Sequence, residues 1–475
     1  MLTLLVAICN IEDTMKMNYR CIVWVSVLSL LSFLSPALGQ EGKQRHAPDA
    51  LPGVEPEMLS PGYWISIQPD ADTVIMTPEE IGRFNAEIRS KKTDGEDFEG
   101  PLFNPILPLN LPASMPGDSL RVLLEHNRSQ LYTPDPLYGS REFYDNRLAI
   151  YSERMKDELS AKMNIAAIHG TITRRFGIVV NHTGVRQYPT SVPGYSDTKV
   201  MLDRFQVTDL NIGYPVAVLH ESADGDFLFV ESPLARGWTP AMDIALANRA
   251  GIRKLAEDHN FIMAAGERVP VYGDPGFRSF ARYLYLSETM PLARKDAKGY
   301  VLRMPYRGLD GSLLMTKGYV RPDADVHPGW LPYTKRAILT QMFKLLNTPY
   351  GWHGQDNKRD CVGTLRVVFR CAGIETGRAI GMASKNRIPV DPKMSIPEKI
   401  AKVAAIEPVI TVVSSPGHTA LLLGKGRNGR LYFMHQGGWG YDENGEHLIV
   451  NRVSINDVEH VWFPISQPNL YTVMR

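Results

Sequence analysis

Residues 63–165 carry apolar positions at helical spacing, interrupted by a Pro-rich stretch from 101 to 116. Thr77 begins a capping box in which Pro78 takes the first helical position and Glu80 can reach back to the cap. The apolar stripe of this region is thin, so we expect it to pack on another part of the chain. We predict one helix that begins at Thr77 and two more that cover residues 118–124 and 142–163.

Residues 166–248 change to short apolar runs separated by turn residues, a pattern typical of β-strands. Short, evenly spaced strands favour a small β-barrel. Residues 258–323 repeat the pattern, which predicts a second barrel. The predicted strands are 171–180, 200–206, 215–221, 227–232 and 237–240 in the first unit and 267–272, 283–291, 300–305 and 318–320 in the second.

Residues 330–475 mix the two patterns. A helix is predicted at 334–346, and apolar residues at i, i+3, i+4 and i+7 predict another directly after Cys361. Strands are predicted at 409–413, 417–424 and 431–435, the last two joined by a polar, Gly-rich turn. In an antiparallel hairpin the start of one strand adjoins the end of its partner, so we expect His418 and His435 to approach each other.

Composition limits the possible classes. The chain has 475 residues, with 52 basic and 51 acidic side chains and a formal net charge of +1. It is too long for one ordinary hydrophobic core. No clustered basic face is evident, so we expect no nucleic-acid partner.

The first 39 residues have the features of a secretion leader. A basic stretch from Met15 precedes an almost wholly apolar run from Cys21 to Phe33, and small residues follow at 37–39. Residues 1–14 would be an over-extended start or an unusual leading segment. The apolar run is too short for a membrane span, and no cysteine follows the predicted cut to carry a lipid. We therefore predict a secreted, periplasmic protein without stable membrane insertion.

Only two of the four cysteines, Cys361 and Cys371, lie beyond this leader. Ten helical residues separate them by about 15 Å of rise, whereas a disulfide needs Cα atoms within about 7 Å. Both should therefore be free. A Gly-rich loop delivers Cys361 to the first turn of its helix, where the helix dipole should favour a thiolate. The alternative interpretation of Cys361 is a buried structural cysteine. For Cys371 that is the interpretation we favour.

Cys361, His418 and His435 together have the composition of a nucleophile, a base and a group that orients the base. The alternative is a metal site in which these histidines converge with His353 and Asp360. No H-E-x-x-H pattern is present and the spacing fits no standard zinc motif. We therefore predict neither a metal nor a cofactor.

Residues 345–440 resemble the NlpC/p60 family of papain-like cell-wall cysteine peptidases. The resemblance is carried by the Pro-Tyr-Gly-Trp run at 349–352, Asp-Cys-x-Gly at 360–363, Gly-His at 417–418 and His435. Residues 185–190, with the later Gly-Trp pair at 237–238, resemble bacterial Src-homology-3-like barrels. The resemblance implies an α+β multidomain chain: two small β-barrels and a papain-like α+β catalytic domain, preceded by a helical N-terminal region. The predicted divisions are 1–39 (signal peptide), 40–165 (helical), 166–248 and 258–323 (barrels) and 330–475 (peptidase).

The resemblance implies an activity and roles for particular residues. Relatives cleave peptidoglycan stem peptides, typically between γ-D-glutamate and a diamino acid such as meso-diaminopimelate, in cell-wall turnover or recycling. Cys361 would be the nucleophile, His418 the base and acid, and His435 the orienting residue. The substrate-binding residues would be Asp360, Tyr350 and Trp352, with Asp360 placed to hold a free substrate amine. The first barrel would narrow the cleft and favour small peptides with a free amino terminus.

The sequence departs from the family pattern at two positions and leaves alternatives open. Val362 replaces the usual Ser, and His353 replaces a usual Gly. His353 either enters the site or is merely solvent-exposed, and we favour the second interpretation. An acyltransferase on the same fold and a catalytically inert wall-binding protein are the alternative functions. Thiol labelling would separate them, because a Cys361 that reacts at neutral pH favours an enzyme. The sequence leaves open the length of the stem peptide and the identity of the diamino acid. It also leaves open whether intact wall or released fragments are cut, and the oligomeric state.

Overall fold

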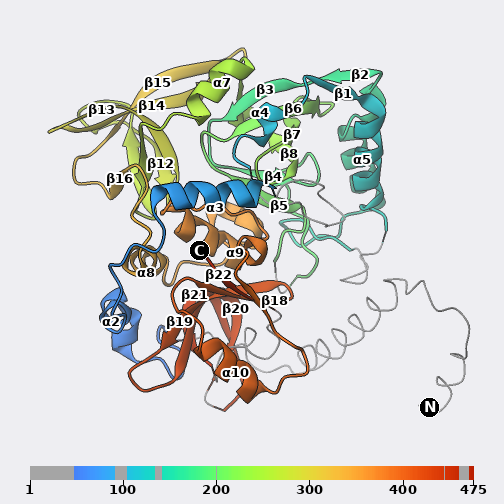
Figure 1. Ribbon diagram of the computed structural model, residues 1–475. Coiled ribbons are helices and arrows are strands. Elements are labelled where there is room, and N and C mark those ends of the chain that lie inside the picture. Colours follow the sequence, from blue (N-terminus) through green and yellow to red (C-terminus); the bar gives the residue numbers. More distant parts are fainter. Residues whose placement is uncertain (1–47, 91–103, 134–141, 199–200, 443, 459–469) are drawn as a thin grey trace, which may run out of the picture. The chain divides into compact units, whose positions relative to one another are not determined.

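The computed structural model describes residues 48–90, 104–133, 142–198, 201–442, 444–458 and 470–475. Within these residues the chain folds into helices, two seven-stranded sheets, one six-stranded sheet and one two-stranded ribbon (Figure 1). The predicted leader lies outside the described residues. No helix in the described ranges is both long and apolar enough to cross a membrane.

The N-terminal region is helical, and its first long helix begins as predicted. The Glu80 amide donates to Thr77 Oγ1 over 3.3 Å, and the Thr77 amide donates to Glu80 Oε2 over 2.8 Å, which completes the capping box. Asn85 on this helix donates to the carbonyl of Gly373, so the helix packs on a distant part of the chain. The helices are α2 (Pro61–Ser66), α3 (Pro78–Ser90), α4 (Leu107–Asn110), α5 (Gly117–Ser129) and α6 (Glu153–Lys162), with 3-10 turns at Pro56–Leu59 and Ile165–Ala167.

The predicted helix over 142–163 is wrong in its first half. Asp145 accepts the amides of Arg147 and Ala149 and so closes a turn, and Tyr144 pairs across it with Ile150. An Asp side chain that bonds to nearby amides competes with a helix in this way. The helix begins only after Ser152, whose hydroxyl caps it.

The first seven-stranded sheet covers most of the first predicted barrel. Residue 200 lies outside the described residues, and from 201 on the expected strand at 200–206 is wrong. Asp203 accepts the amides of Gly194 and Phe205 and holds a turn there; it forms only an isolated bridge with Tyr195, and the continuous strand starts at Gln206. The predicted strand over 171–180 divides into two. In sheet order the strands are β5 (Gln206–Leu210), β4 (Thr183–Arg186), β8 (Arg236–Pro240), β7 (Phe227–Glu231), β6 (Pro215–Glu221), β3 (Arg175–Val179) and β9 (Ile244–Leu246); β1 (Ser114–Pro116) and β2 (Thr171–Thr173) form the ribbon.

The second seven-stranded sheet covers the second predicted barrel and extends to Pro328. The strand expected over 283–291 is wrong, because the chain turns at Ser287, whose φ is +69°. The neighbouring Glu288 carboxylate accepts the Tyr285 amide and closes that turn. In sheet order the strands are β12 (Phe280–Tyr285), β11 (Arg268–Tyr272), β15 (Leu313–Val320), β14 (Gly299–Arg307), β13 (Thr289–Asp296), β10 (Phe261–Ala264) and β16 (Val326–Pro328); helix α7 (Arg249–Ala256) precedes them.

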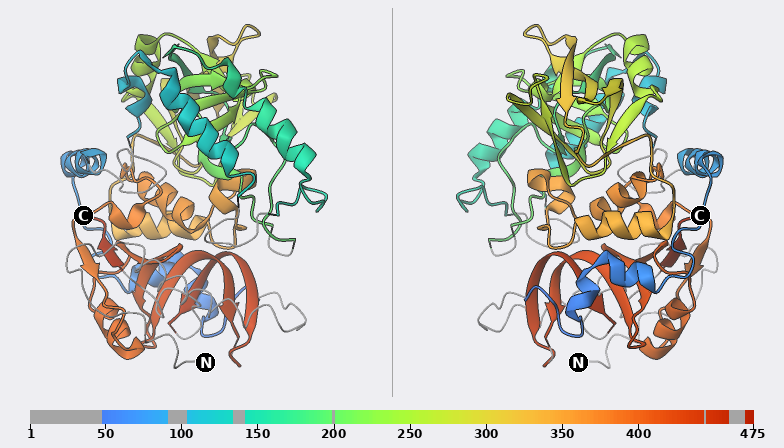
Figure 2. Two further views of the ribbon diagram at one scale, coloured as in Figure 1. Left: turned by 90° about the vertical axis from the view of Figure 1, so that its right-hand side faces the viewer. Right: turned by 90° about the vertical axis from the view of Figure 1, so that its left-hand side faces the viewer.

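The C-terminal part is an antiparallel sheet with helices on both faces (Figure 2). Neighbouring pairs alternate between the faces: Val412 and Leu421 share the core that contains helices α8 and α9, whereas Val413 and Ala420 pack with α10. This is the period-2 alternation of a two-sided sheet. In sheet order the strands are β17 (Arg387–Pro389), β22 (Leu470–Val473), β18 (Thr411–Ser415), β19 (His418–Lys425), β20 (Leu431–Tyr441) and β21 (His447–Asp457); the helices are α8 (Lys335–Lys344), α9 (Cys361–Arg370) and α10 (Ile396–Ala404), with 3-10 turns at Trp352–Asn357 and Ile380–Met382.

Candidate active site

Cys361 is the first residue of helix α9, and local hydrogen bonds fix it there. Asp360 is the N-cap, and its Oδ1 accepts the Gly363 amide over 2.7 Å. The preceding loop is closed by the Gly351 amide, which donates to the Arg359 carbonyl over 2.9 Å. Cys361 is only 7% exposed, and both it and Cys371 are free thiols, as predicted.

Helix α9 is attached to the sheet directly beside the two histidines. The Thr364 hydroxyl donates to Gln436 Oε1 over 2.5 Å, and Gln436 follows His435 on β20. At the helix start, the backbone of Thr419, the residue after His418, lies close enough to the Cys361 thiol to lower its pKa. The thiol therefore lies at the beginning of β19.

His418 and His435 meet as the hairpin predicts. His418 Nε2 lies 2.7 Å from His435 Nδ1, and His435 Nε2 lies 3.0 Å from Asn456 Oδ1. An amide oxygen only accepts, so His435 Nε2 carries a proton and, in the neutral ring, Nδ1 is the acceptor. His418 must then donate from Nε2, which leaves the lone pair on its Nδ1. That tautomer is suited to accepting a proton from a thiol.

The pKa of the Cys361 thiol is raised, whereas the helix dipole alone would lower it. Burial, followed by the charge of Asp360, raises the pKa of Cys361 to about 11, and the lowering effect of the Thr419 backbone does not offset this. Burial also lowers the pKa of His435 to about 4 and, with the neighbouring His435, holds the pKa of His418 well below its ordinary value. Burial therefore opposes the thiolate that the helix start is expected to favour. Two neutral imidazoles, those of His418 and His435, lie on the neighbouring strands β19 and β20.

The predicted substrate-binding residues lie in the loop before α9 and differ in their surroundings. Asp360 is buried, and its Oδ2 accepts the His353 amide and pairs with Arg378. Tyr350 and Trp352 are partly exposed. The carboxylate expected to receive a substrate amine therefore already has a cationic partner.

The sequence did not identify Arg378 or Asn456 as site residues. Arg378 lies 18 positions after Asp360 in an irregular segment beyond α9, where no periodicity indicates which side chains turn inward. Asn456 lies near the end of β21, a strand that the sequence analysis did not predict. The alternating apolar residues Val453 and Ile455 could have indicated that strand.

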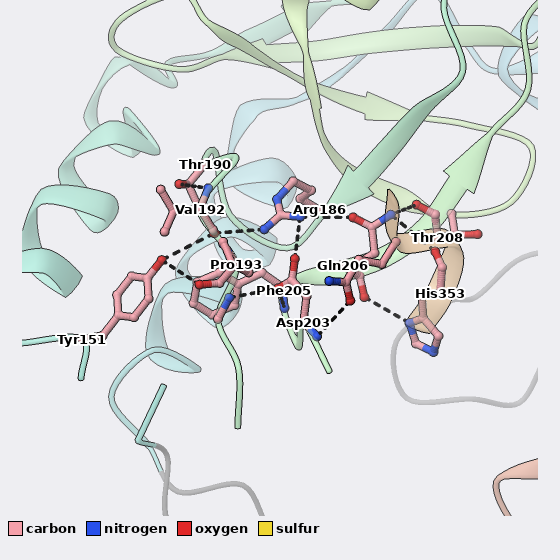
Figure 3. Close-up of polar contacts among 12 residues, drawn as sticks. Tyr151, Arg186, Thr190, Val192, Pro193, Asp203, Phe205, Gln206, Thr208 and His353 are labelled. Carbon is pink, nitrogen blue, oxygen red and sulfur yellow. Dashed lines mark hydrogen bonds and ion pairs between the residues drawn. The ribbon is translucent and has the colours of Figure 1, made fainter. Parts of the chain in front are cut away.

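The interpretation of His353 as solvent-exposed is wrong. Its Nδ1–H donates to the Gln206 carbonyl over 3.0 Å (Figure 3). Its ring stacks on that of Trp352, with ring centroids 4.2 Å apart. Burial lowers the pKa of His353 to about 4, so the ring is neutral. His353 therefore joins the loop before α9 to strand β5 of the first seven-stranded sheet.

Three further features join the first sheet and its flanking loop to the C-terminal part. Gly354 has a φ of +88°, and a Cβ there would lie 2.4 Å from Asp209 on β5. Asp209 in turn pairs with Arg366 of helix α9 over 2.9 Å. Arg204 from the same region stacks its guanidinium 4.6 Å from the Trp352 ring centroid. The first sheet thus borders the loop that carries Tyr350 and Trp352.

The four side chains considered as metal ligands do not form one site; they are His353, Asp360, His418 and His435. Asp360 pairs with Arg378, His353 donates to a carbonyl, and the two remaining histidines bond to each other. In the described part of the chain no group of three His, Cys, Asp or Glu residues is arranged to hold a metal ion.

Comparison with known proteins adds two findings. Residues 194–240 match the model of an SH3 domain of the SH3b1 type, a segment that includes β5 to β8. A solved structure described as a novel NlpC/P60 endopeptidase from Photobacterium damselae subsp. piscicida aligns with a TM-score of 0.68 at 15% identity, covering 87% of this chain and 96% of that one. A Bacillus cereus ATCC 10987 protein of the NlpC/P60 family aligns with a TM-score of 0.45 at 16% identity, over 63% of this chain and 100% of that one. A search of curated proteins returned no match.

These findings define the fold class. The chain shares its fold with the Photobacterium endopeptidase over most of its length, and it contains an SH3b1-type segment beside the candidate active site.

Proposed function

We propose that this protein is a cysteine peptidase that hydrolyses peptidoglycan stem peptides. The observation that carries the proposal is the buried thiol of Cys361 next to the relay formed by His418, His435 and Asn456. The bond we propose is the amide between γ-D-glutamate and a diamino acid, meso-diaminopimelate in the first instance, in cell-wall turnover or recycling. The fold shared with an endopeptidase and the SH3b1-type segment support this choice.

The geometry suggests how the chain would perform the reaction. Cys361 Sγ attacks the carbonyl carbon while its proton passes to Nδ1 of His418, so the thiolate forms only as the new bond does. The Cys361 amide, at the start of α9, donates to the oxyanion. His418 then gives its proton to the leaving amine, and the C–N bond breaks to leave a thioester. Water, deprotonated by His418, releases the acid and restores the thiol.

The relay of ring and amide acceptors makes His418 a competent base. His435 Nδ1 accepts from His418 and so fixes the ring orientation, and Asn456 fixes the ring of His435. When His418 becomes an imidazolium, the neutral acceptor at His435 stabilises it without a buried negative charge. We further propose that Tyr350 and Trp352 line the substrate cleft and that residues 1–39 direct export to the periplasm.

Mass analysis of products tests the proposal. Purified muropeptides are incubated with the full chain, with Cys361→Ala and with Cys371→Ala as a matched cysteine control. We expect the wild type and Cys371→Ala to release a fragment ending in γ-D-glutamate, and Cys361→Ala to release none. Equal hydrolysis by Cys361→Ala would overturn the proposal. Products that carry an added amine in place of water would instead identify the acyltransferase alternative.

A further inference from the structure

The pairing of Asp360 with Arg378 determines the charge next to the nucleophile. The Asp360 carboxylate has three donors: the amides of Gly363 and His353 and the guanidinium of Arg378. Its side chain is 4% exposed, whereas that of Arg378 is 24% exposed. The carboxylate is therefore enclosed, and of the two paired side chains it is that of Arg378 that reaches the surface.

Arg378 also has unused capacity to donate. Its Nη2 pairs with Asp360, but its Nη1 is buried without an acceptor among the described residues. A buried guanidinium nitrogen without a partner is unfavourable, and a carboxylate is the acceptor that best fits its geometry. An acidic ligand would supply that acceptor.

The other acids near the loop also have cationic partners. Asp209 pairs with Arg366, and the exposed Asp356 lies 3.7 Å from Lys358. The guanidinium of Arg204, stacked on Trp352, adds further positive charge on the side of the first sheet. No unpaired carboxylate in the described part of this loop is thus available to bind an ammonium group.

We propose that Arg378 sets the substrate class of the site: an acidic acyl donor whose amino terminus is blocked, as in a stem peptide still linked to glycan. This inference rests on the proposed function and reverses the expectation that Asp360 holds a free substrate amine. Arg378 masks Asp360 and presents its guanidinium to the free carboxylate of the γ-linked D-glutamate. A free ammonium group would face this cation and be disfavoured.

Binding to an inactive protein tests the inference separately from catalysis. The full chain carrying Cys361→Ala is titrated by calorimetry with three tetrapeptides: γ-D-glutamyl with a free L-alanyl amine, the same peptide N-acetylated, and the N-acetylated peptide with the glutamyl carboxylate converted to an amide. The measurements are repeated in Cys361→Ala/Arg378→Gln. Cys361→Ala/Arg154→Gln is the control for net charge, because Arg154 lies 87% exposed on α6.

In Cys361→Ala we expect the N-acetylated acid to bind about tenfold more tightly than either of the other two peptides. This ratio corresponds to the contribution of about one charged hydrogen bond. Arg378→Gln should abolish the preference for acid over amide and raise the relative affinity for the free amine, because it unmasks Asp360. Arg154→Gln should leave both ratios unchanged. Tighter binding of the free amine by Cys361→Ala, or ratios insensitive to Arg378→Gln, would overturn the inference. Wild-type hydrolysis distinguishes the two proposals: a protein that binds in the expected order but cleaves nothing disproves the peptidase and not the subsite.

Discussion

His435 Nε2 lies 3.0 Å from Asn456 Oδ1, and this contact fixes the direction of every proton in the histidine relay. Asn456 Oδ1 also accepts from the Ser454 hydroxyl over 2.9 Å, which holds the amide in the orientation that presents oxygen to His435. An acceptor at this position requires a donor at His435 Nε2. The resulting tautomer is the one that leaves Nδ1 of His418 able to take a proton.

Asn456→Ala should therefore reduce kcat with little change in KM. The variant removes the acceptor that selects the His435 tautomer, but it leaves His418 in place, so the loss should be smaller than the roughly 10²–10⁴-fold contribution of a general base. Steady-state kinetics on muropeptides would measure it. A loss expressed mainly in KM would show that Asn456 contacts substrate.

His435→Asn and His435→Gln should retain part of the activity, and His435→Ala should retain less. An amide oxygen can still accept the His418 proton, whereas a methyl group cannot. Effects within such a unit are not additive, so the comparison concerns single variants of one position. If the alanine and asparagine variants show equal and negligible losses, His435 has only a structural role.

Gly437→Ala tests the position of His435 without altering a polar group. A Cβ at Gly437 would lie 2.6 Å from Cε1 of His435, so the ring must move away from His418 and Asn456. Overpacking of this kind costs about 1–3 kcal/mol, and we expect a fall in both kcat and thermal stability. At Gly438 a Cβ meets nothing within 4 Å, so Gly438→Ala is the matched control and should behave as wild type. Equal activity of the two variants would show that the ring tolerates displacement.

Alkylation of Cys361 should be slow at neutral pH and rise by about tenfold per pH unit toward its raised pKa of about 11, because the thiolate is the reacting species. Mass mapping of iodoacetamide-treated protein at several pH values would follow Cys361 separately from Cys371, whose pKa burial raises to about 12. A rate that reaches a plateau below pH 8 would instead show a resting thiolate–imidazolium pair. Slow labelling at neutral pH is therefore compatible with an enzyme of this kind, contrary to the sequence-based criterion.

The sequence was sufficient where the decisive interactions are local. The capping box at Thr77, the placement of Cys361 at a helix start and the approach of the two hairpin histidines each depend on residues close in sequence or on the geometry of one hairpin. The strand over 215–221 also follows from a local apolar run.

Interactions between distant segments were not predictable in this way. Arg378 reaches Asp360 from an irregular segment, and Asn456 belongs to a strand two positions removed from β19 in the sheet. The ionisation of Cys361 depends on burial by residues from several elements, which periodicity does not reveal. His353 was misjudged because its partner, Gln206, lies 147 residues away.

The junction of both seven-stranded sheets with helix α9 contains a buried histidine that should make stability depend on pH. His182 Nδ1 lies 3.1 Å from Glu288 on the second sheet's side, and its Nε2 lies 3.5 Å from Asp209, which pairs with Arg366 of α9. Burial disfavours the charged ring and so lowers the pKa of His182, and the charge of Arg359 lowers it by a smaller amount. The hydrogen bond and charge of Glu288, with the charge of Asp209, outweigh both and raise the pKa of His182.

A group whose pKa is raised by folding contributes its full stabilisation below its unfolded pKa, about 6.5 for histidine, and loses it as the pH rises through the folded value. His182→Gln should therefore lower the urea midpoint more at pH 5.5 than at pH 9. Removing one partner of a buried charged pair costs about 3–5 kcal/mol. The urea midpoint of His182→Gln at pH 5.5 should therefore lie well below that of the wild type. His126→Gln, at an exposed position on α5, is the control and should shift the midpoint little at either pH. An equal loss for His182→Gln at both pH values would show that His182 stabilises the junction by packing and not by its charge.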